Sequence, residues 1–261
     1  MNKLKVVKIS KTKDLKKVSC QCVPFHLDLS NLNVKLIPSN FAQLNQYLRI
    51  VSVNSETKII GDNAFEGCPI LGIYDGYATI IGKRAFYFCQ VLSGFPFSQV
   101  EEMDESAFQF SGIRDFRAGP KLKNISASCF ADCYKLKSVD LGSVESIGHH
   151  SFDSCSFHTL TLPKTLTKIG NYAFQNCTYL ENLVCLNREP PLICEKTFYG
   201  TTPNKIWVVD EKAANKYSAA KYWSDFKDNI QVLNIDELKK KVNELEKLDE
   251  KRLDTGGFIE I

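Results

Sequence analysis

The sequence has little excess charge of either sign and no long run of apolar residues. Its 261 residues include 33 basic and 30 acidic side chains, a formal net charge of +3. This balance argues against a nucleic-acid partner, because such domains usually carry a concentrated basic face. No stretch approaches the roughly 18 apolar residues that span a membrane, so we expect no membrane insertion.

The start of the chain also lacks the apolar run of an export signal. Residues 1–17 alternate lysine with single apolar residues, whereas a secretory signal needs roughly 7–15 consecutive apolar residues. We therefore expect no signal peptide in this chain.

Motifs for catalysis and metal binding are absent from the sequence. The ten cysteines do not show the short paired spacing of a zinc site. There is no phosphate-binding glycine loop, no H-E-x-x-H and no G-x-S-x-G. His149, His150 and His158 fall where the sequence varies most, so they carry no catalytic pattern. We expect a non-enzymatic protein with no catalytic residues, no metal and no cofactor.

A repeat dominates what is present. The pattern Ile-Gly-x-x-Ala-Phe-x-x-Cys occurs four times if Ser151 is accepted in place of alanine, with three variants and a weaker copy at 36–41. Such a period predicts a solenoid. Its phenylalanines are 21 to 24 residues apart along the chain: Phe65, Phe86, Phe108, Phe130, Phe152, Phe174 and Phe198.

Each column of the repeat has a physical interpretation. The isoleucine and phenylalanine columns are predicted to stack inside the solenoid, and a small residue precedes each phenylalanine. The glycine that follows isoleucine, as in Gly61 and Gly170, is interpreted as a turn residue with an unusual φ. The cysteine column is interpreted as small buried side chains with a weak S–H donor.

Between the repeats, short apolar alternations predict one strand per coil. Phe95–Phe97 and Leu160–Leu162 are clear examples. A single unit with one strand cannot bury its own apolar face, which explains why the units come in an array.

The repeat resembles a known family. Ile169–Cys177, followed by Leu180 and Leu183, is similar to the BspA-like leucine-rich repeat, and Pro190–Phe198 with Ile206–Val209 resembles its terminal coil and cap. The resemblance covers about residues 36–233. It implies an α/β fold, a right-handed leucine-rich-repeat solenoid of about eight coils with one short strand each.

For function, the resemblance implies adhesion to a host or matrix protein, or protein contact in general, at the cell surface or after secretion. It implies no catalytic residues. The sequence departs from the pattern at Asp104, Ser126 and Cys194, where the glycine is lost.

The array divides the chain into four parts. We expect an N-terminal cap at 1–35, the solenoid at 36–209, a C-terminal cap at 210–233, and an amphipathic helix with a flexible tail at 234–261. In this last part, apolar residues follow helical spacing: Ile235, Leu238, Val242 and Leu245. This helix either packs on the solenoid or stays in solvent, or it forms a short coiled coil that makes a homo-oligomer through 234–253.

The candidate binding surface is the outward side of the strands, because alternate residues of a strand point to opposite faces. Each of these residues is either part of a recognition surface or simply solvated surface. They are Tyr74, Asp115, Arg117, Asp140, Thr161, Asn182 and Trp207. Two functions remain open: a non-enzymatic module that binds a protein partner, and a structural component assembled through the C-terminal helix.

Overall fold

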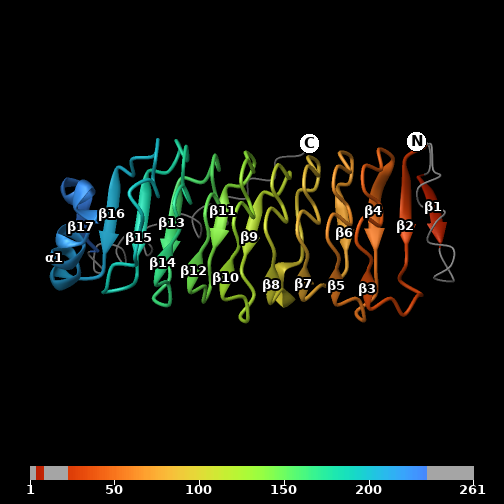
Figure 1. Ribbon diagram of the computed structural model, residues 1–261, viewed down its shortest axis with the longest axis horizontal. Helices are drawn as coiled ribbons and strands as arrows, with labels where there is room; N and C mark the ends of the chain where they lie inside the picture. Colours follow the sequence, from red (N-terminus) through yellow and green to blue (C-terminus); the bar gives the residue numbers. More distant parts are fainter. Residues whose placement is uncertain (1–3, 9–22, 234–261) are drawn as a thin grey trace, which may run out of the picture.

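The computed structural model describes residues 4–8 and 23–233. It is a long parallel solenoid of about nine turns, in which the strands lie across the long axis and the described ends lie at opposite ends of the array (Figure 1). The leucine-rich-repeat solenoid expected from the sequence is therefore confirmed, with about one turn more than expected. The predicted helix and tail at 234–261 lie outside the described residues.

The strands form two rows. The first row contains the longer strands: β1 (Lys5–Lys8), β2 (Phe25–Asp28), β4 (Leu48–Ser52), β6 (Ile73–Asp75), β9 (Asp115–Arg117), β11 (Ser138–Asp140), β13 (Thr159–Leu162), β15 (Asn182–Cys185), β16 (Lys205–Val208) and β17 (Ile230–Val232). All pairings within it are parallel. This row contains the strands that the apolar alternations predict.

The second row runs along the opposite edge of the array (Figure 1) and was not predicted. Its strands have two residues each: β3 (Leu36–Ile37), β5 (Ile59–Ile60), β7 (Ile80–Ile81), β8 (Glu102–Met103), β10 (Asn124–Ile125), β12 (Ser146–Ile147) and β14 (Lys168–Ile169). In each, the second residue belongs to the repeat's isoleucine column and is buried. The first residue of each strand points outward, and this leaves a second face to solvent.

The first row is interrupted at the third repeat. Phe95–Phe97 was predicted as a strand, but that prediction is wrong: only Gly94 forms an isolated bridge, to Ile73, and Phe97–Gln99 is a 3-10 helix. Pro96 has no N–H to donate to a ladder. The sheet β1-β2-β4-β6 consequently ends before β9. The rest of the first row forms two further sheets, β9-β11 and β13-β15-β16-β17.

The phenylalanine column forms the interior as expected. From Phe65 to Phe198 each ring stacks on the next, with centroids 5.2–5.8 Å apart and interplanar angles of 9–21°. The weak first copy differs, because Ala42 and not Phe41 occupies the phenylalanine column. The N–H of Ala42 donates to Ala64 O in the next coil, and the N–H of Phe65 donates to the equivalent atom, Ala85 O, one coil later.

The glycine that follows isoleucine has a different role from the predicted one. Gly61 and Gly170 have no left-handed φ; instead, an added Cβ would lie 2.6 Å from Ser39 N and 2.7 Å from Gly148 C, respectively. The left-handed residues come two positions later, as at Asn63 and Tyr172, with φ of 54° and 59°. Glycine at these positions therefore allows close approach between coils and does not serve turn conformation.

The loss of this glycine at Asp104 does not disturb the ladder. Asp104 N–H donates to Ile81 O at 2.9 Å, and Gly82 N–H donates to Ile60 O at 2.8 Å in the same way.

The C-terminal end of the array is covered by α1 (Glu211–Ala219) and a 3-10 helix, Trp223–Asn229. The side chain of Asp210 accepts a hydrogen bond from Ala213 N–H at 2.8 Å and so caps α1. Trp223 is buried against Phe198, with ring centroids 5.8 Å apart, and its Nε1–H donates to Pro191 O at 2.8 Å. The interior aromatic column is thereby closed at this end.

The ladder extends upstream of the expected solenoid. β2 pairs with β4, and β1 pairs with β2, so parallel strands already occur within 1–35. The expected boundaries at 35, 209 and 233 remain predictions.

Candidate binding surface

Two outward columns run along the first strand row from β9 to β16. Their side chains come from alternate strand positions, and the strand register aligns them within two paired groups, β9 with β11 and β13 with β15 and β16. β11 and β13 lie beside each other but belong to separate sheets. One column contains Asp115, Ser138, Thr159, Asn182 and Lys205; the other contains Arg117, Asp140, Thr161, Val184 and Trp207. Of the predicted site residues, Asp115, Arg117, Asp140 and Thr161 are exposed, and Asn182 and Trp207 are half-buried.

Arg117 and Asp140 form a charged pair at the N-terminal end of this surface. They lie opposite each other in the register, and Arg117 Nε is 3.4 Å from Asp140 Oδ2. Their side chains are 86% and 56% exposed, and an ion pair this exposed adds little stability. Both groups are therefore free to exchange their mutual contact for contacts with a partner.

Trp207 and its neighbours form the C-terminal end of the surface. The Trp207 Nε1–H donates to Asn182 Oδ1 at 3.3 Å, and Lys205 Nζ lies 5.3 Å from the indole centroid. These contacts hold the half-buried ring in one orientation. A rigid aromatic side chain of this kind loses little conformational entropy when it binds a partner.

The prediction that Tyr74 points outward is wrong. Tyr74 is 4% exposed and its ring lies between Phe65, Phe86 and Phe95, with centroid distances of 6.2, 5.6 and 5.1 Å. The outward residues of β6 are Ile73 and Asp75. The spacing contained the correct assignment, because Tyr74 follows Phe65 by nine residues, as the buried Phe95 follows Phe86.

The hydroxyl of Tyr74 is unusual among the buried polar groups. It has no hydrogen-bond partner among the described residues, and burial raises the pKa of this phenol well above its ordinary value. An unpaired buried hydroxyl costs free energy, so Tyr74 contributes its ring to the core at the expense of its polar end.

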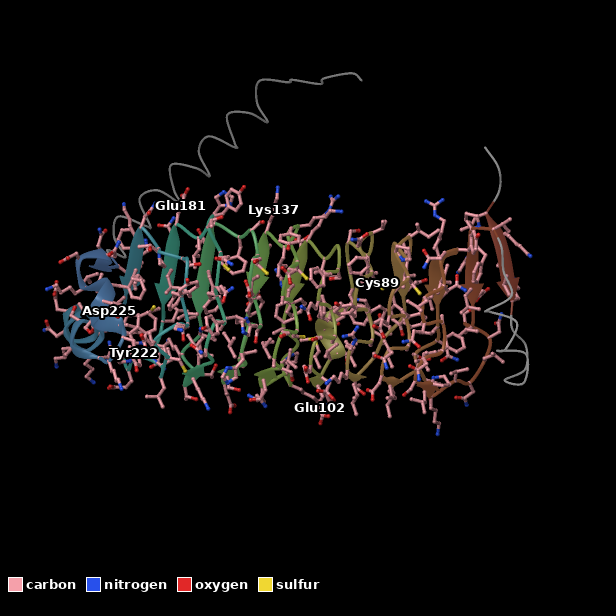
Figure 2. All side chains as sticks on the ribbon, turned by 45° about the horizontal axis from the view of Figure 1, so that its top comes forward. Cys89, Glu102, Lys137, Glu181, Tyr222 and Asp225 are labelled. Atoms are coloured by element: carbon pink, nitrogen blue, oxygen red, sulfur yellow. The ribbon has the colours of Figure 1, made fainter. Side chains whose placement is uncertain are left out.

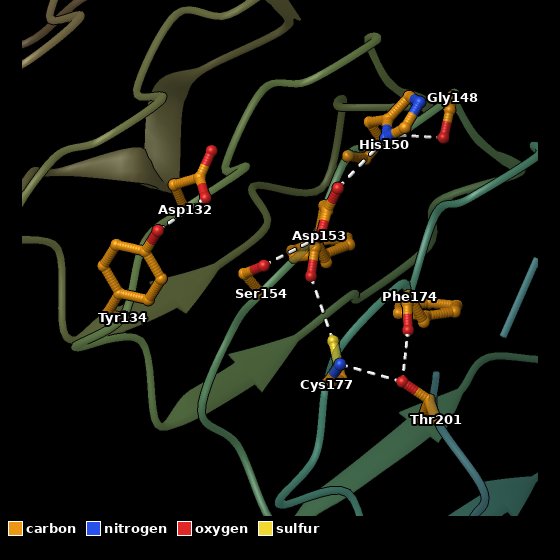
Figure 3. Close-up of polar contacts among 11 residues, drawn as sticks. Asp132, Tyr134, Gly148, His150, Asp153, Ser154, Phe174, Cys177 and Thr201 are labelled. Atoms are coloured by element: carbon orange, nitrogen blue, oxygen red, sulfur yellow. Dashed lines mark hydrogen bonds and ion pairs between the residues drawn. The ribbon is translucent and has the colours of Figure 1, made fainter. Parts of the chain in front are cut away.

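The cysteine column is structural. Each thiol donates to the carbonyl oxygen of the phenylalanine-column residue in the preceding coil, for example Cys89 to Phe65 O at 3.1 Å and Cys177 to Phe152 O at 3.0 Å. Thr201 takes the same place in the last coil, where its Oγ1–H donates to Phe174 O at 2.7 Å (Figure 3). The column therefore selects small side chains that can donate a hydrogen bond.

The same burial makes these thiols unreactive. Burial raises the pKa of Cys133 and of Cys177 to about 12, so both are protonated at neutral pH, whereas the thiolate is the nucleophile. Cys155 also donates to a carbonyl, that of Phe130, while His158 is exposed beside Tyr179. This arrangement does not provide the activated thiol of a cysteine nucleophile.

His150 has a surface contact of its own. Its Nδ1 lies 3.1 Å from Asp153 Oδ2, and its ring stacks on Tyr172 at 4.8 Å (Figure 3).

Within residues 4–8 and 23–233, no group of three or more His, Cys, Asp or Glu could hold a metal ion. No helix in the same ranges is long and apolar enough to cross a membrane.

The residues predicted to form a homo-oligomer, Ile235, Leu238, Val242 and Leu245, lie outside the described residues. That prediction is untested.

Comparison with known proteins identifies the repeat. A family model described as BspA type leucine-rich repeat region matches residues 6–74 and 58–181, in six copies. No protein of curated function matches the chain.

Among solved structures, a leucine-rich cell surface protein from Faecalibacterium prausnitzii is 25% identical with a TM-score of 0.58. The alignment covers 60% of this chain and 44% of that one. A leucine-rich repeat protein from Bacteroides ovatus is 16% identical with a TM-score of 0.42, over 77% of this chain and 64% of that one. The pneumococcal vaccine antigen PcpA is 18% identical with a TM-score of 0.41, over 62% and 45%. The chain thus spans less than two thirds of each of these relatives.

Proposed function

The chain belongs to the BspA type leucine-rich repeat family, and we propose that it is a non-enzymatic module that binds a protein partner through the first strand row. Solenoids of this family are typically non-enzymatic. The partner class that fits best is a host or matrix protein, since the Faecalibacterium relative is described as a cell surface protein.

The observation that carries this proposal is the exposed polar ladder from β9 to β16. It places acidic and basic groups on the paired strands β9 and β11, and hydroxyl and indole groups on the paired strands β13, β15 and β16. None of Asp115, Arg117 or Thr161 is needed to fill the core. Parallel backbone pairing fixes the strands beneath it. A surface that is already ordered binds with a smaller entropic cost.

The binding energy is expected to concentrate at two places on this ladder. Arginine and tryptophan dominate interface energetics, and here Arg117 and Trp207 lie at its two ends, on β9 and β16. We propose that the hydroxyl and amide groups of Thr161 and Asn182 fix the register of the partner between them.

A pull-down with a matched control tests this proposal. The Arg117→Ala/Asp140→Ala variant removes the charged pair of the ladder. The control, Lys123→Ala/Glu145→Ala, removes another surface ion pair, 3.1 Å long, beside the second row. Each immobilised protein is exposed to a mixture of extracellular host proteins, and bound proteins are identified by mass spectrometry. We expect the first variant and Trp207→Ala to lose a partner that wild type and the control retain. Equal retention by all four proteins would rule out the ladder as the binding face.

The alternative function is assembly through residues 234–253. It requires a helix that presents Ile235, Leu238, Val242 and Leu245 to a second chain, as a coiled coil does. Size-exclusion chromatography with light scattering compares the full chain with a truncation after Leu233. An oligomer that becomes a monomer on truncation would support assembly, and a monomer in both forms would exclude it.

A further inference from the structure

The second strand row has a groove that the proposed function does not use. It has a volume of about 510 Å³ and lies over β3, β5, β7 and β8, reaching Asn124 and Ser126 in the next coil. Glu102 projects from this edge of the array, away from Lys137 and Glu181 on the other edge (Figure 2). The groove is therefore separate from the polar ladder of the first row.

One side of the groove is an exposed aliphatic column. Leu36, Ile59 and Ile80 are aligned by the strand register, and the first two are 48% and 37% exposed. In β10, β12 and β14 the same position is polar, with Asn124, Ser146 and Lys168. Aliphatic side chains gathered on one exposed face are a common mark of a binding site.

The end of the groove is acidic. Glu102 follows Ile80 directly in the column, and the lining contains the carboxylates of Asp62, Glu101 and Asp104 but no lysine or arginine. Glu101 is paired with Lys121 at 2.6 Å, whereas no ion pair of Glu102 is found among the described residues. The aliphatic column thus ends at an incompletely neutralised negative charge.

We propose that this groove binds a protein segment in which a block of aliphatic residues is followed by lysine or arginine. The aliphatic block covers Leu36, Ile59 and Ile80, and the basic block lies against Glu102 and Asp104. Burial of the column supplies the apolar part of the affinity. The charge complementarity fixes the orientation of the segment and makes its binding weaken with salt.

The test uses a fluorescein-labelled peptide with a block of leucine and valine followed by a block of lysine. Fluorescence anisotropy measures its affinity for the full chain, at low and at high salt. Two further peptides replace either the lysines by glutamate or the aliphatic residues by serine. We expect binding of the first peptide only, with an affinity that falls as salt is added.

Variants of the groove are compared with matched variants elsewhere. Glu102→Lys and Ile59→Asp are expected to weaken binding about tenfold or more, as for loss of one well-placed interaction. Their controls are Glu181→Lys on the opposite edge, and Leu192→Asp, an exposed leucine that pairs with Lys168 in the last coil. Leu36→Ser repeats the test at a second position, in case Ile59→Asp melts at a lower temperature than wild type.

Two outcomes would overturn the proposal. One is binding of the leucine–lysine peptide that is unchanged in Glu102→Lys and Leu36→Ser, or absent from wild type. The other is self-association of wild type that Ile59→Asp abolishes, since the column would then be covered by a second copy. The pull-down with the Arg117→Ala/Asp140→Ala variant does not depend on either of these outcomes. The proposal for the groove and the proposal for the polar ladder can therefore fail separately.

Discussion

Up to β7, one outward column in each strand row carries aliphatic side chains, whereas the strands from β9 onward have polar or charged residues in the same two columns. Ile50 and Ile73 precede Asp115 and Ser138 in the first row, and Leu36, Ile59 and Ile80 precede Asn124 and Ser146 in the second. The interruption at Pro96 separates the two regions of the first row.

The interiors differ less than the surfaces. The phenylalanine ladder is continuous through both regions. Opposite it, the inward residues are aromatic at Tyr74, Phe95 and Phe116, so the aromatic part extends into β9, and they are aliphatic at Val139, Leu160 and Leu183. The difference teaches that one continuous ring stack supports two different exteriors, so the surface chemistry of this chain can change along its axis without a change of fold.

The largest expected effect tests whether the interior is common to both regions. Phe86→Ala and Phe152→Ala each remove a fully buried ring that stacks on two others. Both should lower the free energy of unfolding by about 3–5 kcal/mol through the cavity that remains. Urea denaturation of the two variants measures this, and near-wild-type stability of only one of them would show that the ladder is not uniform.

A smaller effect is expected from the close approach of the coils. Gly170→Ala would place a Cβ 2.7 Å from backbone atoms of the preceding coil, whereas a Cβ at Gly94 meets nothing within 4 Å. Gly170→Ala should therefore destabilise the chain by about 1–3 kcal/mol, and Gly94→Ala should have almost no effect. Equal melting temperatures of the two variants would contradict the contact-based role of this glycine.

Removal of the unpaired hydroxyl of the buried Tyr74 is expected to increase stability. Tyr74→Phe removes the buried hydroxyl that lacks a partner, and it should raise the free energy of unfolding by about 1 kcal/mol. Tyr217→Phe is the control, because the hydroxyl of this buried tyrosine donates to Asn187 O at 3.2 Å; here stability should fall. A loss of stability in both variants would show that Tyr74 has a hydrogen-bond partner.

The cysteine column predicts a dependence of stability on pH. The pKa of Cys177 rises from 9.0 to about 12 on burial, so above pH 9 the unfolded chain loses a proton that the folded chain keeps. Stability is therefore full below pH 9 and is lost as pH rises toward 12. Melting temperatures at about pH 8 and about pH 10.5 should differ less in Cys177→Ser than in wild type. An equal difference in the two proteins would contradict this linkage between Cys177 and stability.

The smallest effect on the free energy of unfolding is expected for a substitution on the polar ladder. Arg117→Ala should change the free energy of unfolding by less than about 0.5 kcal/mol, because the side chain is 86% exposed. Thermal melting checks this, and a larger loss would mean that Arg117 supports the fold and is not available to a partner.

Much of the fold could be predicted because the repeat is a local pattern. The spacing of the phenylalanines identifies the buried columns. The short alternation of buried and outward residues that follows each phenylalanine identifies strands such as β13 and β15. At Pro96 the same alternation was misleading, since hydrophobic spacing does not reveal a missing N–H. At Tyr74 a shift by one residue exchanged the two faces of a strand.

The second row could not be predicted, because a strand of two residues leaves no periodicity to detect. Its outward column, Leu36, Ile59 and Ile80, is interpretable only when coils about 21 to 23 residues apart are placed side by side. The sequence by itself determined the coil, its interior and its cysteine column, since each depends on residue size at a fixed spacing. Only the tertiary structure decided which side chains face solvent together, because the register between coils depends on backbone pairing and on how closely the glycines let the coils approach.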